Sequence, residues 1–383
     1  MIYLMMMKAL VVTDLSFPTG SAMASRIKSF CMLFKDLGYD VHIIAAKTDN
    51  DHKTDIIYRE KNYSFEIVKS NRSEQIQSFV GNENLLSKVE EYLSNNIVEF
   101  AFFNSLGALF NDVLELCKKH KVKTILEQCE WYDVSNFRFK DLDPRYIRFN
   151  KNIKNNFSKV DGIISISRLL NDYYLSLGAK SIRIPSIFDV ENSIYNTGLN
   201  NKNVKLIYTG SVGKSKEFLK PVLEAMLGYE NITLDIYGLT KDKLLSNLDN
   251  DEGLLHKLGD RVIIHKWVST NELYEAISNS NYQIFIKPER RSSNAQFPTK
   301  LTESMSFGTP VICNNTGDIG LYIKDKENGF ICDANNVSQT FDAISKLTNE
   351  EYNKLRVNAR NTALKYFDYR NYIQDVRKLI EEL

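Results

Sequence analysis

Short runs of β-branched and aromatic residues alternate along the chain with longer stretches in which apolar residues recur at helical spacing. This alternation is typical of parallel sheets whose strands are connected by crossover helices, and it occurs twice. The strands predicted in the first half are Lys8–Thr13, Val41–Ala46, Ser64–Val68, Val98–Phe103, Lys123–Glu127, Gly162–Ile166 and Ser181–Ile184. Those predicted in the second half are Lys205–Thr209, Thr233–Tyr237, Arg261–His265, Gln283–Ile286, Val311–Cys313 and Phe330–Cys332.

The two halves are separated by the segment Ile184–Asn203, whose Asn and Ser residues indicate a linker. We therefore predict an α/β fold with two Rossmann-like domains, residues 1–190 and 191–362, that face each other across a cleft. Residues 363–383 are predicted to form a helix that returns to the first domain. A chain of 383 residues is long enough for two cores, because domains typically contain ~100–200 residues.

The composition indicates an ordinary globular protein. Hydrophobic residues make up 43% and charged residues 25% of the chain, which argues against disorder. The 49 basic and 48 acidic residues give a net charge of +1, which argues against a dedicated nucleic-acid-binding protein. The cysteines are odd in number and scattered, so we expect reduced thiols in the cytoplasm. No apolar run reaches the ~20 residues that span a bilayer.

Residues that follow strands are candidates for function, because ligands of doubly wound sheets bind beyond the carboxyl ends of the strands. After the first strand, Gly20 opens a helix whose first amides suit an anion or sugar hydroxyls. Alternatively, Gly20 only permits a tight turn. The first strand of the second half is followed by glycines, a hydroxyl and two cations, which suit a diphosphate. These residues are Gly210, Ser211, Gly213, Lys214 and Lys216. The alternative is a solvated lysine pair beside a glycine turn.

The segment Phe297–Ile312 contains the most specific pattern in the chain. Pro298 is placed to begin a helix and Gly308 to end it. Glu303 lies one turn into this helix, where a carboxylate is a natural acceptor for the paired hydroxyls of a ribose. Alternatively, Glu303 only complements the helix dipole.

No metal site is predicted. The five histidines have no ligand spacing. Asp141 and Asp143 form an Asp-x-Asp motif, but Pro144 follows directly and no predicted strand precedes it, so we interpret the motif as a surface turn.

Together these motifs resemble those of the GT-B fold glycosyltransferases of family 4, especially those that build bacterial surface polysaccharides. The resemblance spans nearly the whole chain. It rests on Gly20, Glu130–Asp133, Asp161–Ser167, Ile184–Asp189, Tyr208–Gly210, Ile236–Gly238, Phe297–Ile312 and Asn328–Phe330.

The resemblance implies roles for individual residues in binding a nucleotide sugar. Glu303 holds the ribose, Lys214 and Lys216 face the diphosphate, and Leu301 and Thr302 supply backbone donors. The rest of the implied donor site is Gly20, Gly210, Ser211, Gly238, Thr299 and Lys300. The resemblance also implies retention of the anomeric configuration, with Lys214 stabilising the leaving group and no protein nucleophile.

Glu130 and Asp133 follow a predicted strand and are candidates for orienting the acceptor hydroxyl. Alternatively, both carboxylates cap a loop whose aromatic residues, Trp131 and Tyr132, pack into the first domain.

Residues 138–159 have the clearest charge asymmetry of the chain. The basic residues Arg138, Lys140, Arg145, Arg148, Lys151, Lys154 and Lys159 outnumber Asp141 and Asp143. The aromatic and apolar residues at helical spacing are Tyr146, Phe149, Ile153 and Phe157. We consider peripheral contact with an anionic membrane, and alternatively a buried aromatic stripe with a solvated basic face.

The sequence thus predicts a cytoplasmic hexosyltransferase, peripheral at the inner face of the plasma membrane, that uses a UDP- or GDP-linked sugar and a glycan or lipid-linked acceptor. The family usually has a second, sugar-contacting glutamate eight residues before Glu303, where this chain has Ala295. That difference keeps open a noncatalytic nucleotide-sugar-binding subunit of another glycosyltransferase. A sugar-nucleotide epimerase of the same architecture is a further alternative.

Overall fold

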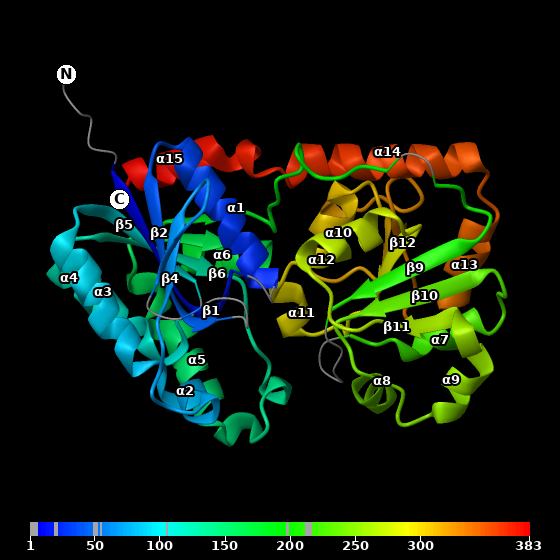
Figure 1. Cartoon of the computed structure of the whole chain (residues 1–383), viewed down its shortest axis with the longest axis horizontal. Coiled ribbons are helices and arrows are strands. Elements are labelled where there is room, and N and C mark those ends of the chain that lie inside the picture. Colours follow the sequence, from blue (N-terminus) through cyan, green and yellow to red (C-terminus); the bar gives the residue numbers. More distant parts are fainter. Residues whose placement is uncertain are drawn as a thin grey trace. The chain divides into compact units, whose positions relative to one another are not determined.

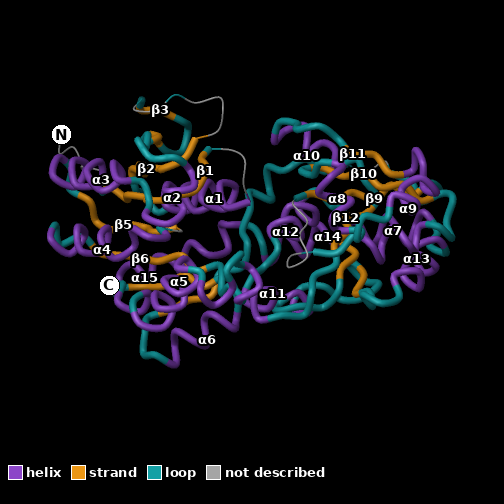
Figure 2. The backbone as a smooth tube through the Cα atoms, turned by 90° about the horizontal axis from the view of Figure 1, so that it is seen from below, coloured by secondary structure: helices purple, strands orange, loops and turns teal. Residues whose placement is uncertain are grey.

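The computed structural model describes residues 7–18, 22–48, 53, 56–104, 106–196, 199–210 and 217–383. The chain forms two compact units (Figure 1). The first comprises Met1–Ile187 with Tyr369–Leu383, and the second comprises Phe188–Asp368. In each unit helices cover both faces of a largely parallel sheet, as the alternating pattern predicts (Figure 2).

The sheet of the first unit has eight strands in the order β3-β4-β2-β1-β5-β6-β7-β8. Its strands are β1 (Lys8–Phe17), β2 (Asp40–Thr48), β3 (Ile57–Arg59), β4 (Ser64–Ile67), β5 (Val98–Asn104), β6 (Lys123–Gln128), β7 (Gly162–Ser165) and β8 (Ser181–Arg183). Neighbouring strands are parallel except β3 and β4. The seven strands predicted for this half are confirmed, but β3 was not predicted. It is a three-residue edge strand whose apolar residue, Ile57, is exposed, so it leaves no buried pattern in the sequence.

An aromatic layer forms the centre of this unit. The helices are α1 (Ala22–Asp36), α2 (Glu74–Val80), α3 (Glu83–Asn95), α4 (Phe110–Lys119), α5 (Pro144–Asn155), α6 (Arg168–Ser176) and α15 (Ile373–Glu381). On α1, the ring of Phe30 lies 5.0 Å from that of Phe102, and Phe34 lies 5.0 Å from Phe100. The apolar face of α1 therefore packs on β5.

The C-terminal helix α15 belongs to the first unit, which includes Tyr369–Leu383. The Tyr369 hydroxyl donates to Asp36 at 3.0 Å. At the start of β7, a Cβ on Gly162 would lie 3.0 Å from a Leu383 methyl group and 3.2 Å from a Leu379 methyl group. A glycine at this position therefore lets α15 and the chain end pack closely on the sheet.

The sheet of the second unit has six parallel strands in the order β11-β10-β9-β12-β13-β14. They are β9 (Val204–Thr209), β10 (Ile232–Tyr237), β11 (Val262–Ile264), β12 (Tyr282–Phe285), β13 (Val311–Cys313) and β14 (Phe330–Ile331), and all six were predicted. The helices are α7 (Lys220–Met226), α8 (Lys241–Asn247), α9 (Glu252–Leu258), α10 (Thr270–Ser278), α11 (Arg291–Ala295), α12 (Thr299–Ser306), α13 (Val337–Ser345) and α14 (Asn349–Tyr366).

The two ends of the second unit are hydrogen-bonded to each other. The Phe188 amide donates to the Phe367 carbonyl at 2.8 Å. The buried carboxylate of Asp368 accepts from the amides of Val190 at 3.0 Å and Glu191 at 3.1 Å. The chain therefore enters and leaves this unit through adjacent segments.

A buried ion pair ties three segments of the first unit together. Arg26 on α1 and Glu127 on β6 are both inaccessible to solvent and form a salt bridge. Arg26 also donates to the carbonyls of Pro185 and, at 3.0 Å, Ile184, which follow β8. Asn104 at the end of β5 donates to the same carboxylate. The buried guanidinium therefore has a carboxylate beside it, and the carboxylate also accepts from Asn104.

Replacing one member of this pair should destabilise the protein strongly. Glu127→Ala leaves the Arg26 guanidinium buried without its carboxylate, which costs about 3–5 kcal/mol in comparable buried pairs. The double variant Arg26→Met/Glu127→Leu should lose clearly less, because no buried charge is left unpaired. Chemical unfolding of the three proteins measures the difference, and equal losses in both variants would contradict the assignment.

Candidate functional site

The carboxyl ends of the central strands of the second unit approach each other closely because two glycines follow them. The Gly210 amide donates to the Tyr237 carbonyl at 3.0 Å. Gly210 and Gly238 have φ values of 118° and 88°, which side-chain-bearing residues rarely adopt. A Cβ on Gly238 would lie 3.0 Å from the Gly210 carbonyl oxygen. These positions therefore require glycine, and they leave backbone exposed to an approaching ligand.

Helix α12 brings the predicted Phe297–Ile312 motif to the same unit. Pro298 is its N-cap, and Leu301, Thr302 and Met305 are buried. The Leu301 amide donates to the Pro298 carbonyl at 3.0 Å, so the structure does not leave it as an open donor for a ligand. The amides of Thr299, Lys300 and Thr302 belong to the helix start, where anions are favoured.

Glu303 is half-buried, one turn into α12. The Tyr274 hydroxyl on α10 donates to its carboxylate at 3.4 Å. Tyr274 is itself held by ring contacts with Phe188 and Phe307, with ring centroids 5.5 Å and 5.0 Å away. This packing orients the carboxylate, which can accept hydrogen bonds from paired hydroxyls.

Lys300 takes part in an ion pair within the protein. Its ammonium lies 2.6 Å from the Glu217 carboxylate and 4.3 Å from the centre of the Tyr208 ring. The Tyr208 hydroxyl donates to the same carboxylate at 2.5 Å, and burial together with Glu217 raises the Tyr208 pKa well above its usual value. A Cβ on Gly210 would lie 3.3 Å from the Lys300 nitrogen. Lys300 is therefore committed to anchoring Glu217.

This anchor fixes the end of the segment that holds the predicted diphosphate-binding residues. Ser211, Lys214 and Lys216 lie outside the described residues, as does Gly20. Directly after them, the Glu217 carbonyl accepts from Asn247 at 2.9 Å, and the Phe218 amide donates to Ile286 at 2.9 Å. The segment 211–216 therefore joins two fixed points, one at Gly210 and one at Glu217.

Lys287 is a buried cation at the end of β12 that the sequence analysis did not single out. Its ammonium donates to the Gln296 side chain at 3.3 Å, and its backbone exchanges two 2.8 Å hydrogen bonds with the Asn314 side chain. Ala295, where relatives of the resembled family usually have a glutamate, is fully buried beside Gln296. The position of Lys287 directly after a buried strand was the signal that would have found it.

In the first unit, carboxylates from two strands meet at Tyr132. The negative charge of Glu130, then burial, then Asp14 raise the Tyr132 pKa well above its usual value. Asp14 was not predicted as a site residue, and it lies within β1, which runs to Phe17 and not to Thr13 as expected. Glu130 follows β6, Asp14 lies on β1, and the charges of both carboxylates act on the Tyr132 hydroxyl.

Asp133 has a structural role in the loop after β6. Its carboxylate and the Asn136 side chain form a capping box at the 3-10 turn η2 (Val134–Asn136), and the Asp133 amide donates to Asn136 at 2.8 Å. Trp131 lies 4.6 Å from the Tyr173 ring and Tyr132 lies 4.7 Å from the Phe149 ring. Asp133 therefore caps this loop and its aromatic residues pack on neighbouring rings, whereas the role of Glu130 stays a prediction.

The Asp-x-Asp motif is not arranged as a metal site. Asp143 caps α5 and is buried, and two hydrogen bonds from the Arg145 side chain, at 2.9 Å and 2.8 Å, help lower the Asp143 pKa to about 2. Within the described ranges, no three His, Cys, Asp or Glu residues are grouped so as to hold a metal ion.

Comparison with known proteins identifies the second unit. Residues 189–366 match the protein-family model described as Glycosyl transferases group 1. No curated protein matches the sequence.

Several solved structures resemble the whole chain. Sucrose-phosphate synthase from Thermosynechococcus elongatus has a TM-score of 0.73 at 15% identity, with 98% of each chain covered. Anabaena HepE in complex with UDP and glucose has a TM-score of 0.70 at 12% identity, covering 98% of this chain and 100% of HepE. The pneumococcal O-GlcNAc transferase GtfA in complex with UDP and GlcNAc has a TM-score of 0.65 at 13% identity, covering 98% and 99%. The chain therefore has the GT-B fold, and residues 189–366 of its second unit match the Glycosyl transferases group 1 model.

Proposed function

We propose that this chain is a retaining glycosyltransferase of family 4 that takes a hexosyl group from a nucleotide sugar and delivers it to a glycan or lipid-linked acceptor in surface polysaccharide synthesis. The observation that carries the proposal is the close approach of Gly210 and Gly238 beside the α12 motif with Glu303. The nucleotide-sugar donor is supported further by HepE and GtfA, whose structures contain UDP with glucose or GlcNAc.

In the proposed reaction the bond between the anomeric carbon and the diphosphate oxygen breaks, and the acceptor oxygen bonds to the same face of the sugar. The acceptor proton passes to a donor phosphate oxygen. Lys214, Lys216 and the start of α12 stabilise the negative charge of the leaving diphosphate, and no metal is required. Glu303 holds the ribose.

On the acceptor side, we assign Glu130 the role of orienting the acceptor hydroxyl, together with Asp14. Carboxylates are strong acceptors for a sugar hydroxyl. Asp133 supports this role indirectly by capping the loop on which Glu130 lies.

A noncatalytic nucleotide-sugar-binding subunit is the second candidate, and the buried Ala295 favours it, since no carboxylate stands there to contact the sugar. Both candidates bind nucleotide sugar, but only the enzyme releases nucleoside diphosphate from it. Thermal-shift measurements with UDP, GDP and their sugars, followed by an assay of donor hydrolysis, distinguish them.

Glu303→Gln should weaken binding of nucleoside diphosphate and of nucleotide sugar by a similar factor, because the ribose contact is common to both. Loss of a charge-assisted hydrogen bond predicts a factor on the order of ten or more in calorimetry. Glu230→Gln, at an exposed turn of the same unit, is the matched control. Parental affinity in the Glu303→Gln protein would reject Glu303 as the ribose ligand.

Lys214→Ala/Lys216→Ala should weaken nucleoside diphosphate binding and slow transfer, since both cations are assigned to the leaving group. The loss should be on the order of tenfold per cation, and smaller for the nucleoside alone. Lys346→Ala/Lys354→Ala removes two exposed lysines of the same unit and should behave like the parent. Unchanged affinity and rate in the first variant would exclude this assignment.

Lys300→Met should reduce both stability and diphosphate binding. It leaves Glu217 without its cation, which we expect to cost about 2–3 kcal/mol at this nearly buried position. In Lys300→Met/Glu217→Gln the thermal stability should largely return, because no unpaired charge remains, whereas diphosphate affinity should stay low because the segment 211–216 has lost its anchor. Calorimetry that finds parental affinity in the double variant would show that the anchor does not serve binding.

A further inference from the structure

Exposed large hydrophobic side chains are concentrated at one end of the first unit. Among the described residues eighteen such side chains are exposed, and six of these lie in three neighbouring segments, namely α2, the stretch 134–142 with its two 3-10 turns, and α5. They are Ile76 and Val80 on α2, Val134 on η2, Phe139 and Leu142 at the 3-10 turn η3 (Lys140–Leu142), and Ile147 on α5. We call these six residues the apolar patch. Leu142 is 77% exposed and Phe139 54% exposed, so neither contributes to the core.

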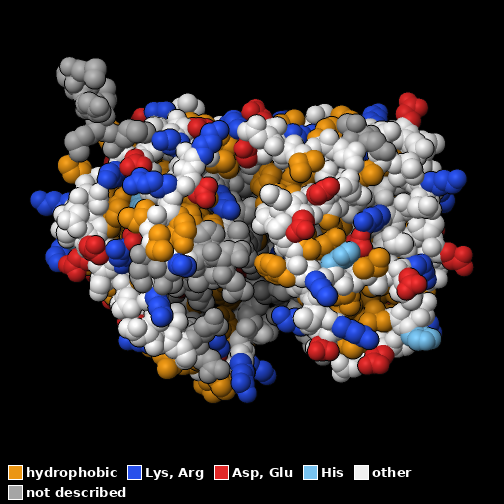
Figure 3. Space-filling view, in the orientation of Figure 1, with side chains coloured by type: hydrophobic (Ala, Val, Ile, Leu, Met, Phe, Trp, Pro, Cys, Tyr) orange, Lys and Arg blue, Asp and Glu red, His pale blue; other side chains and the backbone are white. Residues whose placement is uncertain are grey.

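The three segments are held together by arginines of α5. The Arg145 guanidinium lies 4.9 Å from the centre of the Phe79 ring and 5.9 Å from that of Phe137. Arg148 donates to the carbonyls of Phe79 and, at 3.4 Å, Ser78. Helix α2 is therefore fixed against the start of α5 (Figure 1), and Figure 3 shows hydrophobic and basic side chains together on the lower part of this unit.

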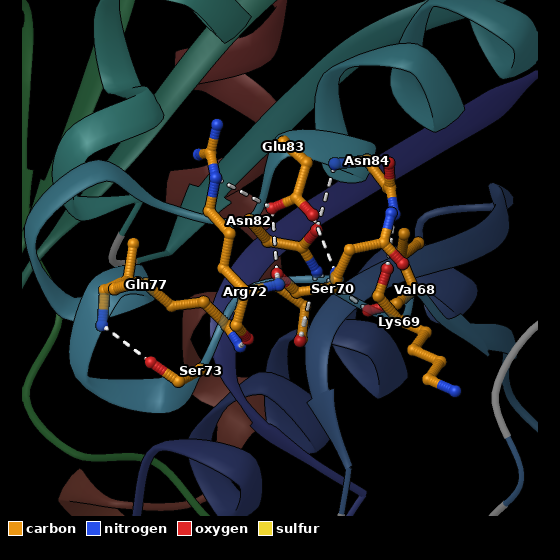
Figure 4. Close-up of polar contacts among 12 residues, drawn as sticks. Val68, Lys69, Ser70, Arg72, Ser73, Gln77, Asn82, Glu83 and Asn84 are labelled. Atoms are coloured by element: carbon orange, nitrogen blue, oxygen red, sulfur yellow. Dashed lines mark hydrogen bonds and ion pairs between the residues drawn. The ribbon is translucent and has the colours of Figure 1, made fainter.

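The segments on both sides of α2 are hydrogen-bonded within the unit, with Asn82 and Glu83 at the start of α3 and Gln77 on α2 itself, as the close-up in Figure 4 shows. Asn82 donates to the Val68 carbonyl at 2.8 Å, and Glu83 accepts from Ser70 at 2.8 Å. Gln77 donates to the Arg72 carbonyl at 2.8 Å. The exposed side chains of Ile76 and Val80 therefore lie on a helix that is held in place by hydrogen bonds.

The aromatic and apolar residues of segment 138–159 that recur at helical spacing pack against the protein and do not face solvent. Ile153 and Phe157 are buried, the Phe149 ring packs on Tyr132 at 4.7 Å, and Tyr146 packs on Phe137 at 5.5 Å. These four residues belong to the interior because their spacing matches the inner face of α5. The solvent-facing apolar residues of the segment are instead those of the apolar patch.

Cations surround the apolar patch. Ile147, Lys151 and Lys154 recur at i, i+4 and i+7 and share the outer face of α5. The exposed basic residues of segment 138–159 are Arg138, Lys140, Lys151, Lys154 and Lys159, whereas Asp141 is its exposed acidic residue and Asp143 is buried against Arg145.

We propose that the apolar patch and its basic surround dock this protein on a bilayer that contains anionic phospholipid. Apolar side chains enter the interface between headgroups and acyl chains while neighbouring cations attract the headgroups, which is how peripheral proteins bind such membranes. No helix in the described part of the chain is long and apolar enough to cross a bilayer, so the contact is peripheral. The inference deepens the proposed function, since it assigns the lipid-linked class of acceptor.

Co-sedimentation of the full chain with vesicles tests this surface. The parent should bind vesicles of phosphatidylcholine with one quarter phosphatidylglycerol, bind pure phosphatidylcholine much less, and bind more weakly as salt rises. Phe139→Ser/Leu142→Ser should reduce binding at least about tenfold, because two inserted side chains are lost. Arg138→Glu/Lys140→Glu should abolish the preference for anionic vesicles.

The matched control is Leu175→Ser/Leu177→Ser, which changes two similarly exposed leucines at the end of α6 and should bind vesicles like the parent. Circular dichroism and calorimetry with UDP and GDP confirm that every variant folds and retains nucleotide affinity. The inference would be overturned if the parent does not bind anionic vesicles. It would also be overturned if the Phe139→Ser/Leu142→Ser variant binds them like the parent. A parent that binds vesicles but no nucleotide would instead reject the proposed donor site.

Discussion

The candidate donor site depends on how closely the ends of β9 and β10 approach each other. Gly210 and Gly238 adopt left-handed backbone conformations, and a single added carbon at Gly238 would press on the Gly210 carbonyl. The same absence of a side chain at Gly210 leaves space for the Lys300 ammonium. A backbone constraint at two residues thus determines how the ends of β9 and β10 meet and leaves room for Lys300 at the start of α12.

In both units an ion pair between a helix and a distant residue holds a segment that follows a strand. In the first, Arg26 joins α1 to Glu127 and to the chain leaving β8. In the second, Lys300 joins α12 to Glu217 at the end of the segment after β9. Such pairs cost desolvation and add little net stability, but they are satisfied in one geometry only. We infer that they specify where the functional loops lie.

Much of the fold was predictable because parallel strands are buried on both faces and give continuous apolar runs. The short edge strand β3 was not, since Ile57 is exposed. The motif around Glu303 was recognisable from its local spacing. The partner of Lys300 was not, because Glu217 lies 83 positions away in the sequence. Asp14 and Lys287 belong to no spaced motif, and only their places near the ends of strands could have drawn attention to them.

The chain enters the second unit after Ile187 and returns to the first at Tyr369, and this order affects how the protein folds during synthesis. The second unit is an insertion into the first, and its ends meet where Asp368 binds the amides of Val190 and Glu191. A ribosome therefore delivers the whole second unit before α15, the element whose Leu379 covers Gly162, has been made. Until then the part of this sheet that α15 covers is open to solvent, and the first unit can complete its folding only once α15 has been made.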